Sequence, residues 1–166
     1  MQKISASLWF DKNAEEAMNF YVSVFEAAPR AKAGESEITT IKRYPGGYTE
    51  GPLANMEGKV LTGVFQLAGQ QFMALDGGPL FKFNEAVSLV VECEDQAEID
   101  YFWGKLSAVP ESEQCGWLKD KFGVSWQIVP NNMDELMQIP GAMDALLKMQ
   151  KLNIAELKAA GQPPKS

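Results

Sequence analysis

The feature that most constrains the fold of this chain is an internal repeat. Residues 7–10 (SLWF) and 88–91 (SLVV) both have a strand-like composition and both begin with Ser-Leu. Each is followed, after a short polar gap, by an acidic segment with apolar residues at helical spacing. The same offset aligns further apolar and aromatic residues: Met18 with Ile99, Phe20 with Tyr101, Tyr21 with Phe102, Val22 with Trp103, and Phe25 with Leu106. The sequence therefore predicts a duplicated unit with its seam in residues 76–84.

The first half is predicted to have the order strand, helix, strand, strand, strand. Asn13 and Glu16 have the spacing of a capping box ahead of the helix. Residues 45–59 are rich in Gly, Pro and polar residues and are expected to form a long loop. Strand patterns occupy residues 4–10, 38–44, 60–67 and 70–75, the last two joined as a hairpin around Ala68-Gly69.

The second half repeats this order less completely. Residues 86–91 are predicted to be a strand, and Asp95 with Glu98 forms a second capping box. Residues 115–119 and 124–129 have strand patterns, and the second of these stops at Pro130. A strand inside residues 111–114 is needed to complete the repeat, although its signal is weak.

The C-terminal segment differs from both halves. It contains three short helical patterns, and Asn153 caps the last of them before it stops at Gly161, ahead of Pro163-Pro164. Their apolar faces are expected to pack on the sheet or on a second subunit. The predicted fold class is α+β, with a first module at 1–76, a linker at 77–85, a second module at 86–130 and a helical extension at 131–166, all in one compact domain.

Composition excludes several classes of function. The net charge of −7 argues against nucleic acid as a partner, because binding to its backbone depends on Lys and Arg. No apolar run reaches membrane-spanning length, and the N-terminus has no secretory pattern, so a cytoplasmic protein without a membrane partner is expected. Two cysteines do not make a disulfide framework.

The absence of histidine restricts the chemistry further. It excludes the Ser-His-Asp and Cys-His nucleophile pairs and removes the commonest ligand of transition metals. Acid–base work would fall to Asp, Glu, Lys, Tyr or Cys. Cys115, with no histidine beside it, is expected to be an inert thiol rather than a nucleophile.

Three segments around the repeat carry a resemblance to a known family. They are ALDGGP at 74–79, FNEAVS at 83–88, and the run from Cys115-Gly116-Trp117 to Pro130. With the duplicated pattern, they resemble the PhnB-like branch of the glyoxalase/bleomycin-resistance/dioxygenase (vicinal oxygen chelate) superfamily, often labelled 3-demethylubiquinone-9 3-methyltransferase domain. The resemblance runs from about residue 4 to residue 130 and into the segment PNNMDELM.

This resemblance implies two paired βαβββ modules that form a curved mixed sheet around a cavity, within a homodimer. Catalytic members of the superfamily hold a divalent metal with His and Glu residues from the first and last strands of each half. Here residues 4–8 and 86–89 contain no histidine, and Asp76 with Gln127 makes a poor set of metal ligands. No metal and no cofactor are therefore expected. The methyltransferase label is not supported either, because Gly46-Gly47 and Gly77-Gly78 lack the context of a cofactor-binding turn.

Six residues are candidates for ligand binding. Aromatic residues near strand centres either pack in the core or line the cavity, where they favour flat or apolar ligands. Asp76 is either a turn residue that accepts backbone N–H bonds or a polar anchor, and Glu85 either caps a crossover or contacts a ligand or subunit. The candidates are Trp9, Phe65, Asp76, Glu85, Trp117 and Trp126.

Two functions from different classes follow. The first is a metal-free protein that binds a small, partly aromatic molecule in the sheet cavity. The alternative is an enzyme that uses carboxylates alone or a hard divalent metal such as Mg²⁺ or Mn²⁺. An interaction module without a ligand is a third reading, and the fold does not decide among the three.

Overall fold

The computed structural model describes residues 2–163 and divides the chain into two compact units, between Phe83 and Asn84. This division lies inside the predicted linker at 77–85. The last residues of the predicted extension, 164–166, lie outside the described residues. We call the two parts unit 1 and unit 2 and describe each by itself.

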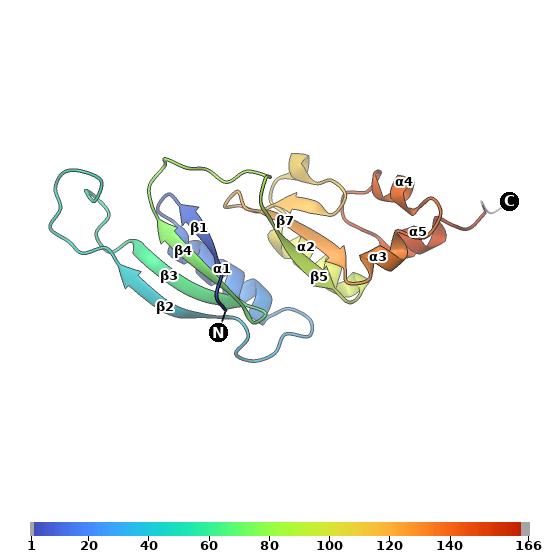
Figure 1. Ribbon diagram of the computed structural model, residues 1–166, viewed down its shortest axis with the longest axis horizontal. Helices are drawn as coiled ribbons and strands as arrows, with labels where there is room; N and C mark the ends of the chain where they lie inside the picture. Colours follow the sequence, from blue (N-terminus) through green and yellow to red (C-terminus); the bar gives the residue numbers. More distant parts are fainter. Residues whose placement is uncertain (1, 164–166) are drawn as a thin grey trace. The chain divides into compact units, whose positions relative to one another are not determined.

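Unit 1 has the predicted order of elements. These are β1 (Ala6–Phe10), α1 (Ala14–Glu26), β2 (Glu37–Arg43), β3 (Val60–Leu67) and β4 (Gln70–Asp76). The strands form one sheet in the order β1-β4-β3-β2, in which β1 runs parallel to β4 and the other pairs are antiparallel (Figure 1). The hairpin between β3 and β4 turns at Ala68 and Gly69, whose φ angles of 48° and 80° suit a two-residue hairpin turn.

The core of unit 1 lies between α1 and one face of this sheet. The inner side of α1 includes Met18 and Tyr21, both fully buried. Met18 packs directly on the backbone of β3, since a Cβ added at Gly63 would lie 2.6 Å from its side chain. Phe65 lies two residues farther along β3 and therefore points to the same, helix-covered face.

Unit 2 contains a smaller sheet. Its elements are β5 (Ser88–Cys93), α2 (Gln96–Leu106), a 3₁₀ helix η1 (Pro110–Ser112), β6 (Trp117–Lys119) and β7 (Ser125–Pro130). The strand order is β5-β7-β6, with β5 parallel to β7 and β6 antiparallel to it (Figure 1). This reproduces the parallel first and last strands of unit 1.

The strand predicted inside residues 111–114 is wrong. The 3₁₀ helix η1 takes up the first half of that segment, Glu111 and Ser112, and an isolated bridge joins Gln114 to Trp117. Pro110 explains the difference, because its fixed φ suits the start of a helical turn and it has no N–H to give to a ladder.

The extension forms the three predicted short helices, α3 (Met133–Leu136), α4 (Ala142–Leu146) and α5 (Ile154–Ala159). They enclose a small core of their own around Leu136, Met149, Leu152 and Leu157. Backbone bonds fasten the extension to the rest of unit 2, with Cys115 N donating to Met149 O and Gly116 N to Gln150 O, both at 2.8 Å.

Two of the three predicted side-chain caps are confirmed. Asp95 accepts a hydrogen bond from Glu98 N, and Asn153 accepts one from Glu156 N, each at 3.0 Å. Asn13 makes no side-chain cap bond, and the first N–H of α1, Ala14 N, donates to Asp76 of β4. Within residues 2–163, no helix is long and apolar enough to cross a membrane.

Candidate functional site

The candidate site is the sheet face of unit 2 that lies opposite α2. Trp126 and Ile128 of β7 are buried on the α2 side, so the alternate residues of β7 point the other way. The strand register then places two rows of side chains on that opposite face. The serine row runs across β5, β7 and β6 as Ser88, Ser125 and Lys119, and the tryptophan row runs as Val90, Gln127 and Trp117. We call these two rows the open face of unit 2.

Two interactions involve the serine row: a neutral hydrogen bond between Ser88 and Gln127 of the neighbouring row, and an ion pair at Lys119. Gln127 donates from Nε2 to Ser88 Oγ at 2.9 Å. Lys119 forms an ion pair with Glu85, which precedes β5. The hydrogen bond from Lys119 holds the pKa of Glu85 below its ordinary value, helped by a backbone hydrogen bond and the positive charge. The positive charge of Lys119 and the negative charge of Glu85 therefore compensate each other next to the serines.

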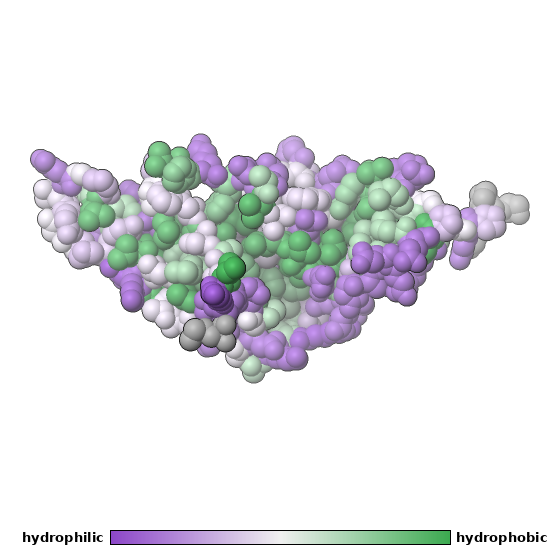
Figure 2. All heavy atoms as spheres, in the orientation of Figure 1, coloured by the Kyte–Doolittle hydropathy of each residue, from purple (hydrophilic) through white to green (hydrophobic). Residues whose placement is uncertain are grey.

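The tryptophan row supplies apolar surface. Val90 is 54% exposed and contributes apolar surface to this row. Figure 2 shows hydrophobic side chains, in green, at the surface over the area of β5 and β7. Trp117 is half-buried, and no ring contact or side-chain hydrogen bond is found for it among residues 2–163. The Trp117 ring therefore has no stacking or hydrogen-bonding partner among these residues.

Trp9 lies on the corresponding face of unit 1, but its side chain is already engaged. Its Nε1 donates to Gly78 O at 2.9 Å, and its ring meets Phe81 edge-on at 4.9 Å between centroids. It also lies against Gly77, where an added Cβ would approach the ring to 2.2 Å. Trp9 therefore holds the turn after β4.

Phe65 and Trp126 lie on the helix-covered faces of their sheets. Phe65 is fully buried and stacks on Phe72, with ring centroids 5.5 Å apart. Trp126 is 1% exposed and donates from Nε1 to Asp120 Oδ2 at 2.8 Å. Both residues have the contacts of core residues, the first of the two readings open from the sequence.

Asp76 is 1% exposed and bonds to the backbone of two other elements. Its Oδ1 accepts a hydrogen bond from Ala14 N at 2.9 Å, and its Oδ2 accepts one from Val60 N at 2.8 Å. It also borders a polar hollow of about 400 Å³ at the start of α1. The carboxylate thus accepts backbone N–H bonds, as one reading of the sequence had it, and ties α1 and β3 to the end of β4.

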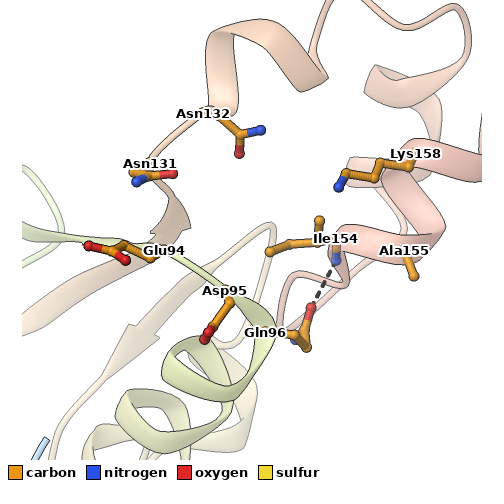
Figure 3. A pocket seen from close by; sticks show the side chains of 8 residues that line it. All are labelled: Glu94, Asp95, Gln96, Asn131, Asn132, Ile154, Ala155 and Lys158. Atoms are coloured by element: carbon orange, nitrogen blue, oxygen red, sulfur yellow. Dashed lines mark hydrogen bonds between the residues drawn. The ribbon is translucent and has the colours of Figure 1, made fainter. Parts of the chain in front are cut away.

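A second hollow, of about 420 Å³, lies in unit 2 where the extension meets the first turn of α2 (Figure 3). Gln96 forms its floor and donates to Leu152 O while accepting from Ile154 N, both at 2.9 Å. The remaining lining combines charged, amide and apolar side chains: Glu94, Asp95, Asn131, Asn132, Ile154, Ala155 and Lys158. The hollow is wide and lies between the extension and the first turn of α2.

The residues present do not fit the divalent metal that the superfamily implies. Within residues 2–163, no group of three or more His, Cys, Asp and Glu side chains is placed to hold a metal ion. On the open face of unit 2, the strand positions carry Ser88 and Gln127, which bond to each other. Neutral hydroxyl and amide groups of this kind are weak ligands for transition metals.

The structure thus brings only some of the predicted residues together. Trp117 lies on the open face, and Glu85 reaches it through Lys119. Trp9, Phe65 and Asp76 belong to unit 1, and Trp126 lies on the opposite face of β7. Ser88 and Ser125 also lie on this face and are not among the residues predicted from the sequence. The duplicated Ser-Leu motif marks the first of them, but the register that joins both to Trp117 is not visible in the sequence.

Comparisons with known proteins agree with this architecture. Residues 2–129 match the model of the 3-demethylubiquinone-9 3-methyltransferase family. The chain is similar to the structure of a putative 3-demethylubiquinone-9 3-methyltransferase, PhnB protein, from Bacillus cereus, with 41% identity over 77% of this chain and 99% of that one, and a TM-score of 0.59. Protein PA1353 from Pseudomonas aeruginosa shares the fold, with 17% identity over 78% of this chain and 98% of that one, and a TM-score of 0.54. No curated protein sequence matches the chain.

Proposed function

The chain belongs to the 3-demethylubiquinone-9 3-methyltransferase (PhnB-like) family, and from this premise we propose that it binds a small, partly aromatic molecule without a metal. The open face of unit 2 is the proposed binding surface. The observation that carries the proposal is Trp117, whose half-buried indole has no ring contact or side-chain hydrogen bond among residues 2–163 and which shares the sheet face opposite α2 with exposed Val90. Aromatic rings in such a position favour stacking with flat ligands.

The proposal does not extend to methyl transfer. A doubly wound methyltransferase brings its cofactor to a Gly-rich turn that leads from a strand into a helix. Gly46-Gly47 lies in the loop between β2 and β3, and Gly77-Gly78 follows β4 and leads toward β5. Neither pair precedes a helix.

The test is a thermal-shift and fluorescence titration of the purified protein with aromatic metabolites, in the presence and absence of EDTA. A ligand at about a hundred times its Kd should stabilise the fold by about 2.7 kcal/mol. We expect a shift that EDTA leaves unchanged. A shift produced by Mg²⁺ or Mn²⁺ and reversed by EDTA would instead support the enzyme alternative.

A matched pair of variants locates the site. Trp117→Leu should weaken binding about tenfold, because one stacking contact and its apolar area are lost. Trp103→Leu, on α2, removes a half-buried indole away from the open face and should leave the affinity unchanged. Equal loss in both variants would contradict the proposed surface.

A further inference from the structure

Ser125 presents a buried hydroxyl that the protein does not satisfy. It is 2% exposed, and its Oγ has no hydrogen-bond partner among residues 2–163. Leaving a buried hydroxyl unpaired costs roughly 1–3 kcal/mol. By register it lies between Ser88 on β5 and Lys119 on β6, in the middle of the serine row.

The neighbours of Ser125 leave further hydrogen-bonding capacity on the same face. Ser88 Oγ accepts the Gln127 amide, so the Ser88 hydroxyl proton is free to be donated elsewhere. The Gln127 Nε2 group is used in that contact, and the Oε1 atom has no hydrogen-bond partner among the described residues. The face therefore offers two hydroxyl donors and one amide group within two adjacent strands.

The two charged side chains at this row are already paired with each other. Lys119 is paired with Glu85, so neither charge is available alone to a ligand. A carboxylate ligand would compete with Glu85, and an ammonium ligand would compete with Lys119, each breaking an existing pair. A neutral group that both donates and accepts matches the serines and the amide without disturbing this pair.

From these positions we infer that the ligand of the open face is a neutral aromatic carbonyl compound, of the carboxamide or lactam class. Its carbonyl oxygen accepts from the hydroxyls of Ser88 and Ser125, its N–H pairs with the Gln127 amide, and its ring lies on Trp117, across β7 from Val90. Because Ser125 is 2% exposed, binding requires the groups that cover its hydroxyl to move aside. This inference rests on the proposed function and adds the ligand class to it.

The experiment is a ¹⁵N–¹H NMR titration with four probes of similar size: benzamide, benzoate, benzylamine and toluene. Benzamide should bind at least about tenfold more tightly than the two charged probes, with shifts at the amides of Ser88, Ser125 and Gln127. Ser125→Ala should weaken benzamide binding about threefold to tenfold, which is the worth of one hydrogen bond, and should leave toluene binding unchanged. Ser23→Ala, an exposed hydroxyl on α1, is the matched control and should change neither.

The outcomes distinguish failure of the ligand class from failure of the proposed aromatic binding. If benzamide and toluene bind this face equally and Ser125→Ala changes neither, the ligand class is overturned while aromatic binding stands. If no probe shifts the amides of the open face, both the ligand class and the proposed function fail. If Ser125→Ala only raises the thermal stability, the hydroxyl is a core defect and the inference is overturned. Ser88→Ala provides a second, independent loss of one donor.

Discussion

At the scale of single residues, two buried aspartates hold loops of this protein in place. Asp76 accepts two backbone N–H groups in unit 1, from α1 and β3. In unit 2, Asp120 accepts Phe122 N and Val124 N through Oδ1 and the Trp126 indole through Oδ2. Each carboxylate is 1% exposed, so its bonds are shielded from water. Charge-assisted bonds of this kind are stronger than neutral ones.

Replacing Asp76 by alanine should destabilise the protein by about 2–4 kcal/mol, because two buried N–H groups lose their acceptor. Urea unfolding measured by circular dichroism checks the value. Asp11→Ala, at an exposed carboxyl just before α1, is the control and should shift the midpoint little. A loss below about 0.5 kcal/mol would contradict the structural role given to Asp76.

The two thiols should differ in reactivity. Burial raises the pKa of Cys93 from 9.0 to about 12, with the charges of Glu98 and Asp95 adding to the effect, whereas Cys115 is half-exposed. At pH 8 a disulfide reagent should modify one thiol in the native protein and two in urea. In the native state, the Cys115→Ser variant should show no modified thiol. Rapid reaction of Cys93 would contradict its burial.

The same shift has a defined sign in stability. A raised pKa means that the folded state favours the protonated thiol, so unfolding above pH 9 releases its proton. The contribution of Cys93 is therefore fully present below about pH 9 and is lost as the pH rises toward about 12. The stability difference between the natural chain and Cys93→Ala should shrink over that interval.

At the scale of elements, prediction from sequence succeeds where the signal is local. The β3–β4 hairpin follows from two residues that adopt positive φ, and the caps at Asp95 and Asn153 from side chains that bond three residues ahead. It fails where a distant residue decides. Asp76, 62 positions from Ala14, accepts the first N–H of α1, whereas the predicted cap Asn13 makes no side-chain bond there. The open face is missed for the same reason, because register across three strands is a long-range property.

Gln96 of α2 is one of the side chains that hold the extension in place. The Gln96 amide pairs with Leu152 O and Ile154 N, as a neighbouring strand would. Gln96→Ala should lower stability by about 1–2 kcal/mol and speed amide hydrogen exchange at Cys115 and Gly116, whose N–H groups bond to the extension. Gln138→Ala, at an exposed glutamine just after α3, should leave that exchange unchanged. Unaltered exchange in the Gln96 variant would show that the extension is held elsewhere.

For the whole molecule, the repeat in the sequence is visible as two units that each have a parallel first and last strand. The repeat could not reveal that unit 2 has three strands where unit 1 has four, because η1 depends on Pro110 within an otherwise matching segment. The fold class and the family are thus confirmed, while ligand binding stays a proposal.

We propose that the protein is a homodimer, an expectation that the exposed apolar side chains of the extension support. Met143 and Leu147 lie four residues apart on and after α4 and are 53% and 58% exposed. Sedimentation equilibrium at micromolar concentration should give twice the chain mass of 18.3 kDa. Leu147→Asp should reduce this mass if α4 is in the interface, and Lys148→Asp is its neighbouring control. A particle of 18.3 kDa for the natural chain would refute the dimer.

The backbone bonds from Met149 and Gln150 to Cys115 and Gly116 have a consequence for aggregation. A sheet of three strands, one of them only three residues long, leaves N–H groups at its edge that invite another chain to add a strand. The carbonyl groups of the extension bond to Cys115 and Gly116, which directly precede β6, and so cover the backbone where this edge strand begins. Removal of the extension should therefore appear first as concentration-dependent self-association under native conditions, ahead of any loss of the sheet itself.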